Sequence, residues 1–148
     1  MVDPHEARRR AWRHLVSAVK LPIVRLGVNR ISMVEGHELS VLRGGIKTIR
    51  RCLPMMLIEI EERHKQNAIR DVQEFLAEID YEGYFLLNSS LTTMNRFNLK
   101  RHQNVANIGG WKTNWTRYEV YVNNFFFIPA GGRSRLEAAV RDVKDLLS

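Results

Sequence analysis

The chain has 148 residues, of which 45% are hydrophobic, and it contains a single cysteine. Its 23 lysine and arginine residues against 16 aspartate and glutamate residues give a formal net charge of +7. This composition excludes low-complexity disorder and a disulfide scaffold, and it is typical of one globular domain with its own core. No apolar run approaches the roughly 20 residues of a membrane-spanning helix. No secretory leader is apparent, so the reduced cytoplasm is the expected compartment.

Basic residues gather in three groups along the chain. These groups are Arg8, Arg9, Arg10, Arg13 and His14; Arg43, Lys47, Arg50 and Arg51; and Arg96, Lys100 and Arg101. Such groups can hold phosphates, anionic lipid or an acidic substrate, although solvated helix faces are the simpler interpretation. Nucleic acid is not favoured as a partner, because no aromatic-rich signature accompanies the groups.

Residues 1–27 are expected to form a basic N-terminal helix and a connector. An apolar stripe at helical spacing begins at Trp12 and predicts a helix over Pro4–Lys20, which Pro22 ends. A turn at residues 27–30 then leads into a short strand predicted over Ile31–Val34.

A long helix is predicted over Leu39–Leu53, where apolar residues recur at spacings of three and four. Glu35 and Glu38 lie near its start and arginines lie near its end, which suits the helix dipole. Gly44 and Gly45 fall in the middle and lower the helix propensity. Their expected use is close approach of the helix to a sheet.

The middle of the chain alternates strand and helix signals. Met55–Ile60 is a nearly continuous apolar run after Pro54, which predicts a strand covered on both faces. Asn67 is positioned to cap the next helix, and Gly83 precedes a strand predicted over Tyr84–Leu87.

The C-terminal part begins with the least patterned stretch of the chain. Residues 88–114 are polar and predict a long loop with some helix. Glu119–Val122 and Phe125–Ile128 are rich in β-forming residues, and the last helix is expected to start near Ser134. The alternation of strands and helices predicts an α/β fold, a sheet with flanking helices. Ligands are then expected at the carboxyl ends of the strands.

The first cluster of chemically active residues joins the predicted strand 31–34 to the following helix. It contains Glu35, His37 and Glu38. Two carboxylates and an imidazole could hold a metal or act as base for a hydroxyl nucleophile. Stabilisation of the helix dipole is the structural alternative. A zinc site is not indicated, because the chain has one cysteine. A site for a nucleoside triphosphate is not indicated either, because no phosphate-binding loop of the Walker type is present.

The second cluster contains Glu59, Glu61 and His64, at the end of the apolar strand. A carboxylate at the end of a buried strand is costly without a partner, so catalysis and a structural ion pair are equally supported. Because parallel strands end at the same edge of a sheet, we expect Glu35 to lie close to Glu59. Asn123 and the asparagine after it predict a hairpin turn.

The runs Val34–Gly45 and Pro54–Glu61, which read VEGHELSVLRGG and PMMLIEIE, resemble the FkbM family of S-adenosylmethionine-dependent methyltransferases. The likeness extends from Val28 to Pro129. It implies a Rossmann-like methyltransferase sheet with an antiparallel last strand, S-adenosylmethionine as cofactor, and O-methylation of a sugar, glycolipid or small-molecule hydroxyl. No metal is expected. Together with the two clusters, it makes candidates of the following residues: for catalysis Glu35, His37, Glu38 and Glu59, and for substrate binding Glu61 and His64.

Two features depart from the family pattern. Met33 stands where the family usually has an aspartate, and the residues before Val34 contain no glycine-rich turn of the kind found in the family's cofactor half. Residues 28–148 therefore look like the C-terminal region of such an enzyme, with a partial sheet and weak or absent binding of S-adenosylmethionine. The open interpretations are a truncated or split enzyme completed by an N-terminal half or a second copy, and a non-catalytic remnant that binds a partner or an anionic ligand through its basic helices.

Overall fold

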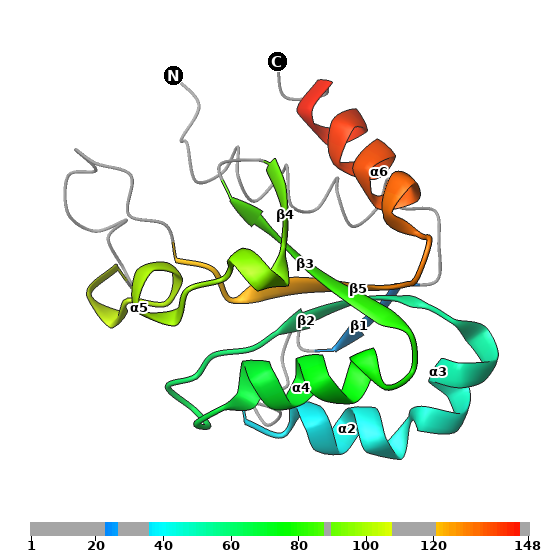
Figure 1. The fold of residues 1–148 in the computed structure, drawn as a ribbon, viewed down its shortest axis with the longest axis horizontal. Coiled ribbons are helices and arrows are strands. Elements are labelled where there is room, and N and C mark those ends of the chain that lie inside the picture. The colour runs from blue at the N-terminus through cyan, green and yellow to red at the C-terminus, as the bar shows by residue number, and fades with distance from the viewer. Residues whose placement is uncertain (1–22, 27–35, 88–89, 108–120, 146–148) are drawn as a thin grey trace.

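The computed structural model describes residues 23–26, 36–87, 90–107 and 121–145. The helix expected over Pro4–Lys20, the strand expected over Ile31–Val34 and the side chain of Glu35 lie outside these residues. Within the described residues, one five-stranded sheet carries helices on both of its faces (Figure 1). The prediction of an α/β fold is therefore confirmed.

The sheet has the strand order β1-β2-β5-β3-β4. The strands are β1 (Ile23–Leu26), β2 (Met55–Glu59), β3 (Tyr81–Leu87), β4 (Ser90–Thr93) and β5 (Asn124–Pro129). β1 is parallel to β2, whereas β5 is antiparallel to both β2 and β3, between which it lies. β4 returns antiparallel along β3 at the edge of the sheet. The expected antiparallel last strand is therefore present, and β2 and β3 run in the same direction.

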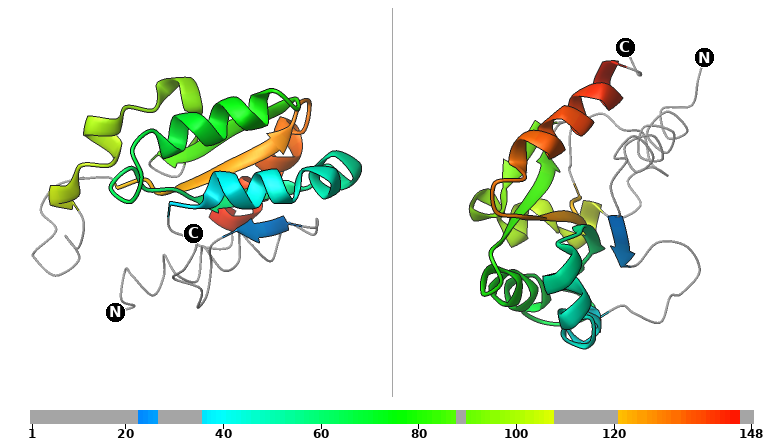
Figure 2. Two further views of the ribbon diagram at one scale, coloured as in Figure 1. Left: turned by 90° about the horizontal axis from the view of Figure 1, so that it is seen from below. Right: turned by 90° about the vertical axis from the view of Figure 1, so that its right-hand side faces the viewer.

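Alternate side chains of the central strands are buried on opposite faces of the sheet. Met56 and Ile58 of β2 pack in one core cluster with residues of α2 (Glu38–Gly44) and α4 (Ala68–Ala77). Met55 and Leu57 pack in a second cluster with residues of α6 (Arg133–Asp145). Figure 2 shows α2 and α4 on one side of the sheet and α6 on the other. The apolar run of β2 is thus covered on both faces, as predicted.

The long helix predicted over Leu39–Leu53 is instead two short helices, α2 and α3 (Ile46–Cys52), which meet at Gly45. The N–H of Gly45 donates to the carbonyl of Val41, and its own carbonyl accepts from Ile49. A methyl group built at Gly44 would meet nothing within 4 Å, so the predicted close approach to the sheet is wrong. Two adjacent glycines stabilise a continuous helix poorly, and the chain divides there.

The stretch predicted as a loop holds more regular structure than its polar sequence indicates. After β4 come the 3-10 turn η1 (Met94–Arg96), the helix α5 (Leu99–His102) and the 3-10 turn η2 (Val105–Asn107). The strand predicted over Glu119–Val122 is wrong for residues 121 and 122, which are irregular. The N–H of Val122 donates to the carbonyl of His102 at 2.7 Å, a partner outside the sheet. Residues 119 and 120 lie outside the described ranges.

The carboxyl end of β2 and the start of α2 lie at the same side of the molecule (Figure 1). The loop from β2 to α4 crosses this side, and the irregular segment before β5 returns there, because β5 is antiparallel to β2. Three parts of the chain that are distant in sequence therefore converge where an α/β sheet usually binds its ligand: the start of α2, the end of β2 with its following loop, and the segment before β5.

Candidate functional site

A bridging amide holds two carboxylates at the carboxyl end of β2. Glu59 is the last residue of the strand and is half-buried. The side-chain Nδ2 of Asn123 donates to Oε1 of Glu59 at 2.6 Å and to Oε1 of Glu61 at 3.4 Å. Asn123 is brought to this position by a backbone hydrogen bond, in which the N–H of Ile60 donates to its carbonyl at 2.8 Å. The amide offsets part of the cost of bringing two carboxylates out of water.

Glu61 accepts two further hydrogen bonds on its other oxygen. The hydroxyl of Tyr121 donates to Oε2 at 2.7 Å, and the guanidinium of Arg63 donates to the same oxygen. Burial alone would raise the pKa of Glu61, but the hydrogen bonds from Arg63, Tyr121 and Asn123 outweigh it and leave the pKa below its usual value. Burial, aided by the hydrogen bond to Glu61, raises the pKa of the Tyr121 hydroxyl. At neutral pH the pair is therefore a fixed carboxylate and a protonated phenol.

Gln103 joins the segments that form this site. The side chain is 7% exposed, and its Nε2 donates to the carbonyls of Ile60 at 2.7 Å and Val122 at 2.8 Å. Its Oε1 accepts from the N–H of Glu62 at 3.0 Å. One buried amide thus satisfies three backbone groups that have no strand partner. It fixes α5 against both the end of β2 and the segment that carries Tyr121.

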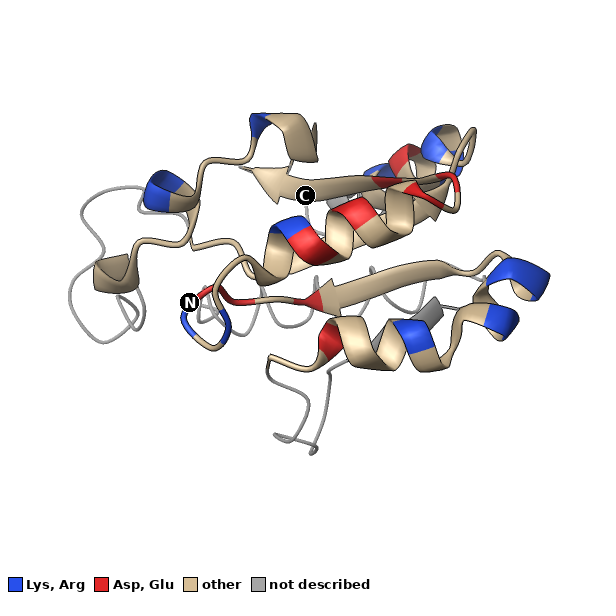
Figure 3. Cartoon of the chain, turned by 60° about the horizontal axis from the view of Figure 1, so that its bottom comes forward, with Lys and Arg blue, Asp and Glu red and all other residues tan. Residues whose placement is uncertain are grey.

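The turn before α2 lies beside the loop that follows β2. Gly36 has a φ of +80°, and a Cβ built on it would lie 3.4 Å from Cβ of Lys65 and 3.5 Å from the carbonyl oxygen of His64. The first residue of α2, Glu38, is buried, and its Oε1 accepts from the N–H of Gly36 at 3.0 Å. Figure 3 shows acidic positions at the end of β2 and at the start of α2, on the same side. The backbone of the turn that contains Gly36, His37 and Glu38 therefore lies beside the backbone of the loop that contains Glu61 and His64.

The candidate residues differ in their surroundings. Glu59 and Glu61 share the network of Asn123, whereas Glu38 bonds its own turn. His37 and His64 are exposed and belong to the two adjacent turns. The proximity of Glu35 to Glu59 stays a prediction, because Glu35 lies outside the described residues.

Four residues of the network were not candidates from the sequence: Arg63, Gln103, Tyr121 and Asn123. The sequence predicts a hairpin turn at Asn123, but this prediction is wrong, because the next residue, Asn124, already begins β5. The available signal was a pair of asparagines directly before a buried apolar strand, where an amide can reach carboxylates on a neighbouring antiparallel strand. Gln103 carried no signal, because its three partners are set by the tertiary fold.

A comparison with protein families gives a match to this part of the chain. Residues 34–86 match the methyltransferase FkbM domain. The resemblance seen in the sequence is confirmed over this segment, which covers a little over a third of the chain and contains all six candidate residues. It runs from the turn before α2 through β2 and α4 almost to the end of β3. No curated protein and no solved structure matches the chain significantly.

Two further properties of the described ranges bear on the site. They contain no group of three or more His, Cys, Asp or Glu side chains placed to hold a metal ion. They also contain no helix with the length and hydropathy needed to span a bilayer.

Proposed function

We propose that this chain is part of an S-adenosylmethionine-dependent O-methyltransferase of the FkbM type, and that its acceptor is a hydroxyl of a sugar, glycolipid or small molecule. The match of residues 34–86 to the FkbM domain carries the proposal. The polar network at the carboxyl end of β2 supports it, because ligands of α/β sheets bind at this edge.

The sheet topology supports a partial Rossmann-like methyltransferase sheet. β1, β2 and β3 run in the same direction, and β5 lies antiparallel between β2 and β3. A last strand that is antiparallel to its neighbours is the feature that the family resemblance implies. In this proposal, residues 28–148 form the region that holds the acceptor.

The hydrogen bonds and burial of the candidate residues support different roles for them in proton transfer and acceptor binding. Glu61 is a poor general base, because its lowered pKa and its three donors disfavour protonation. Glu38 is buried, and its carboxylate accepts a hydrogen bond from the N–H of Gly36 in its own turn. Exposed His37 is suited to take the proton of the acceptor hydroxyl, since a ring nitrogen of an imidazole can act as a general base. Glu59, held by Asn123, orients the same hydroxyl, and Glu61 and His64 contact the rest of the acceptor.

The described residues do not complete a donor site. S-Adenosylmethionine supplies the methyl group when it is bound, and proteins of this fold class hold such ligands at a glycine-rich turn between a strand and a helix. Gly131 and Gly132 join β5 to α6, but β5 is antiparallel to β2, so this turn lies at the opposite end of the sheet from Glu59. We therefore assign no methyl-transfer step to the described residues.

The test is made in the cells that encode the chain. Deletion of its gene should remove a methyl ether from an extracted glycan, lipid or small molecule, which mass spectrometry detects as the loss of one CH₂. The wild-type gene should restore the methyl ether, and Glu59→Gln should not. Glu82→Gln, a matched change of an exposed glutamate on β3, should restore it fully. An unchanged methyl-ether content after deletion contradicts the proposal.

A further inference from the structure

The segment Met94–Asn107, here called the α5 arm, has a buried side and an exposed side that carries two large aliphatic side chains. His102 and Gln103 are 3% and 7% exposed, and the ring of His102 packs against Phe85 and Phe97 at centroid distances of 5.3 Å. On the outside, Leu99 is 43% exposed and Val105 is 63% exposed. The arm is therefore firmly anchored, and its exposed aliphatic side chains are held in place by that anchoring.

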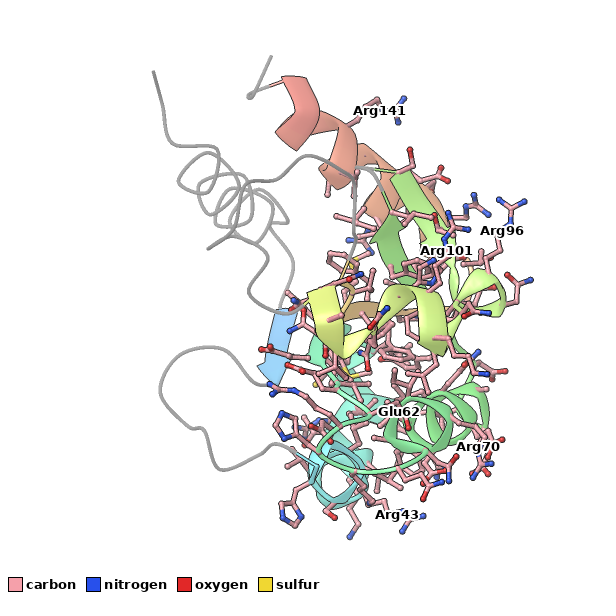
Figure 4. All side chains as sticks on the ribbon, turned by 90° about the vertical axis from the view of Figure 1, so that its left-hand side faces the viewer. Arg43, Glu62, Arg70, Arg96, Arg101 and Arg141 are labelled. Atoms are coloured by element: carbon pink, nitrogen blue, oxygen red, sulfur yellow. The ribbon has the colours of Figure 1, made fainter. Side chains whose placement is uncertain are left out.

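The α5 arm is also purely basic. Arg96, Lys100 and Arg101 are exposed, and the arm contains no acidic residue. The ion pairs of the described residues involve none of these three cations. Figure 4 shows Arg96 and Arg101 extending from the same side of the ribbon. No acidic residue occurs between Glu82 and Glu119 in the sequence.

We propose that the α5 arm docks on an anionic membrane surface, with Leu99 and Val105 in the headgroup region and the three cations against lipid phosphates. Exposed aliphatic side chains flanked by unpaired basic residues are the combination that interfacial binding uses. A nucleic acid would favour aromatic stacking surfaces in place of aliphatic side chains.

Docking through this arm would bring the candidate site to the membrane. Gln103 bonds the end of β2, and the carbonyl of His102 accepts from Val122, the residue between Tyr121 and Asn123. The α5 arm and the loop after β2 lie at the same side of the molecule (Figure 1). On the basis of the proposed function, the acceptor is then a lipid-linked hydroxyl presented at the bilayer surface.

A second basic and apolar feature, at the end of α3, provides the matched control. Leu53 is 54% exposed and follows Arg50 and Arg51, but it precedes β2 and so lies at the opposite end of that strand from Glu59. Its φ of 44° suits asparagine, so Leu53→Asn removes an equally exposed side chain with little strain.

The test is flotation of the purified full chain with phosphatidylcholine vesicles, with and without phosphatidylserine, in low and high salt. We expect binding only to the vesicles with phosphatidylserine, weakening as salt rises. Lys100→Gln and Arg101→Gln should each weaken it about five-fold. The double variant Leu99→Ser/Val105→Ser should weaken it further, while Leu53→Asn should bind as wild type. Circular dichroism confirms that each variant is folded.

Two results with the wild-type chain would overturn the docking proposal: no vesicle binding in low salt, or equal binding to vesicles without phosphatidylserine. Two results with the variants would do the same. One is displacement of the chain from the vesicles by RNA while Leu99→Ser/Val105→Ser binds as wild type, and the other is an equal loss of vesicle binding in Leu53→Asn. The proposed function is tested separately by the methyl ether. Vesicle binding by a chain whose deletion leaves all methyl ethers unchanged would retain the docking and contradict the methyltransferase. A methyl ether that depends on the chain, found on a water-soluble product alone, would contradict the lipid-linked acceptor.

Discussion

At the scale of single residues, His102 is a buried imidazole with one unpaired nitrogen. Its Nδ1 accepts from the N–H of Asn98 at 3.0 Å, whereas Nε2 has no partner among the described residues. Burial, aided by the charge of Arg101, lowers the pKa of His102 below its usual 6.5. The neutral ring is therefore the folded form at neutral pH, and protonation must oppose folding.

We predict that His102 makes the protein less stable in acid. The unfolded chain takes up this proton near pH 6.5 and the folded chain only at lower pH, so stability falls as the pH drops below 6.5. The loss is about 1.4 kcal/mol for each pH unit until the folded-state pKa is reached. His102→Gln keeps an acceptor for Asn98 but does not titrate, and should reduce this loss. Urea unfolding at pH 8 and pH 5 measures the effect, with exposed His37→Gln as the control that should retain it.

The side-chain amide of Asn123 bridges the carboxylates of Glu59 and Glu61, and we predict that a third carboxylate in its place destabilises the fold. Asn123→Asp should lower the free energy of unfolding at pH 7 by about 1–3 kcal/mol, because the donor to Glu59 and Glu61 is lost and a like charge is added. The loss should shrink near pH 4, where carboxylates begin to be protonated. Asn104→Asp is the control, since an aspartate there still accepts from the N–H of Ala106. Equal losses at both pH values would contradict the electrostatic explanation.

At the scale of elements, α4 is capped by a residue from the preceding loop. The sequence predicts Asn67 as the cap, but its side chain makes no capping hydrogen bond, and its φ is 63°. The carboxylate of Glu62 instead accepts from the N–H groups of Asn67 at 2.6 Å and Ile69 at 3.0 Å. A carboxylate at this end of a helix is favoured by the helix dipole.

We predict that Glu62→Ala lowers the free energy of unfolding by about 1–2 kcal/mol, the usual cost of losing a helix cap. Glu62→Gln keeps an acceptor and loses only the charge, so it should cost less than Glu62→Ala. Denaturant unfolding measures both variants. Glu78→Ala, an exposed change at the other end of α4, should be nearly neutral, and a loss there as large as at Glu62 would argue against capping.

The apolar pattern of the sequence predicts the elements that form the core. β2, β3, β5, α4 and α6 carry it, because their buried side chains recur at strand or helix spacing. The division at Gly45, the edge strand β4 and the α5 arm are not predicted, since their sequences are polar or glycine-rich. The α5 arm is in addition held by partners distant in sequence, such as Ile60, whose carbonyl accepts from Gln103. The polar network was missed for the same reason. Glu59 and Asn123 are 64 positions apart and meet only because β5 pairs with β2.

At the scale of the whole molecule, the two ends of the sheet are chemically different. The carboxyl end of β2 carries Glu59, Glu61 and their partners. The opposite end carries the turn at Gly131 and Gly132, where Gly131 has a φ of +81°. A donor held at that turn would be separated from the carboxylates by the length of the strands, and proximity could not assist methyl transfer.

We therefore predict that the purified chain binds S-adenosylmethionine weakly, with a Kd above about 1 mM, which corresponds to a binding free energy no more favourable than about −4 kcal/mol. Tight binding in this fold class needs a glycine-rich turn and a carboxylate for the ribose at the same edge of the sheet. At that edge the carboxylates of Glu59 and Glu61 are already bonded to Asn123, Tyr121 and Arg63. Calorimetric titration of the full chain measures the affinity, with S-adenosylhomocysteine as a second ligand. Micromolar binding, or methyl transfer by this chain alone, would show that residues outside the described ranges complete the donor site.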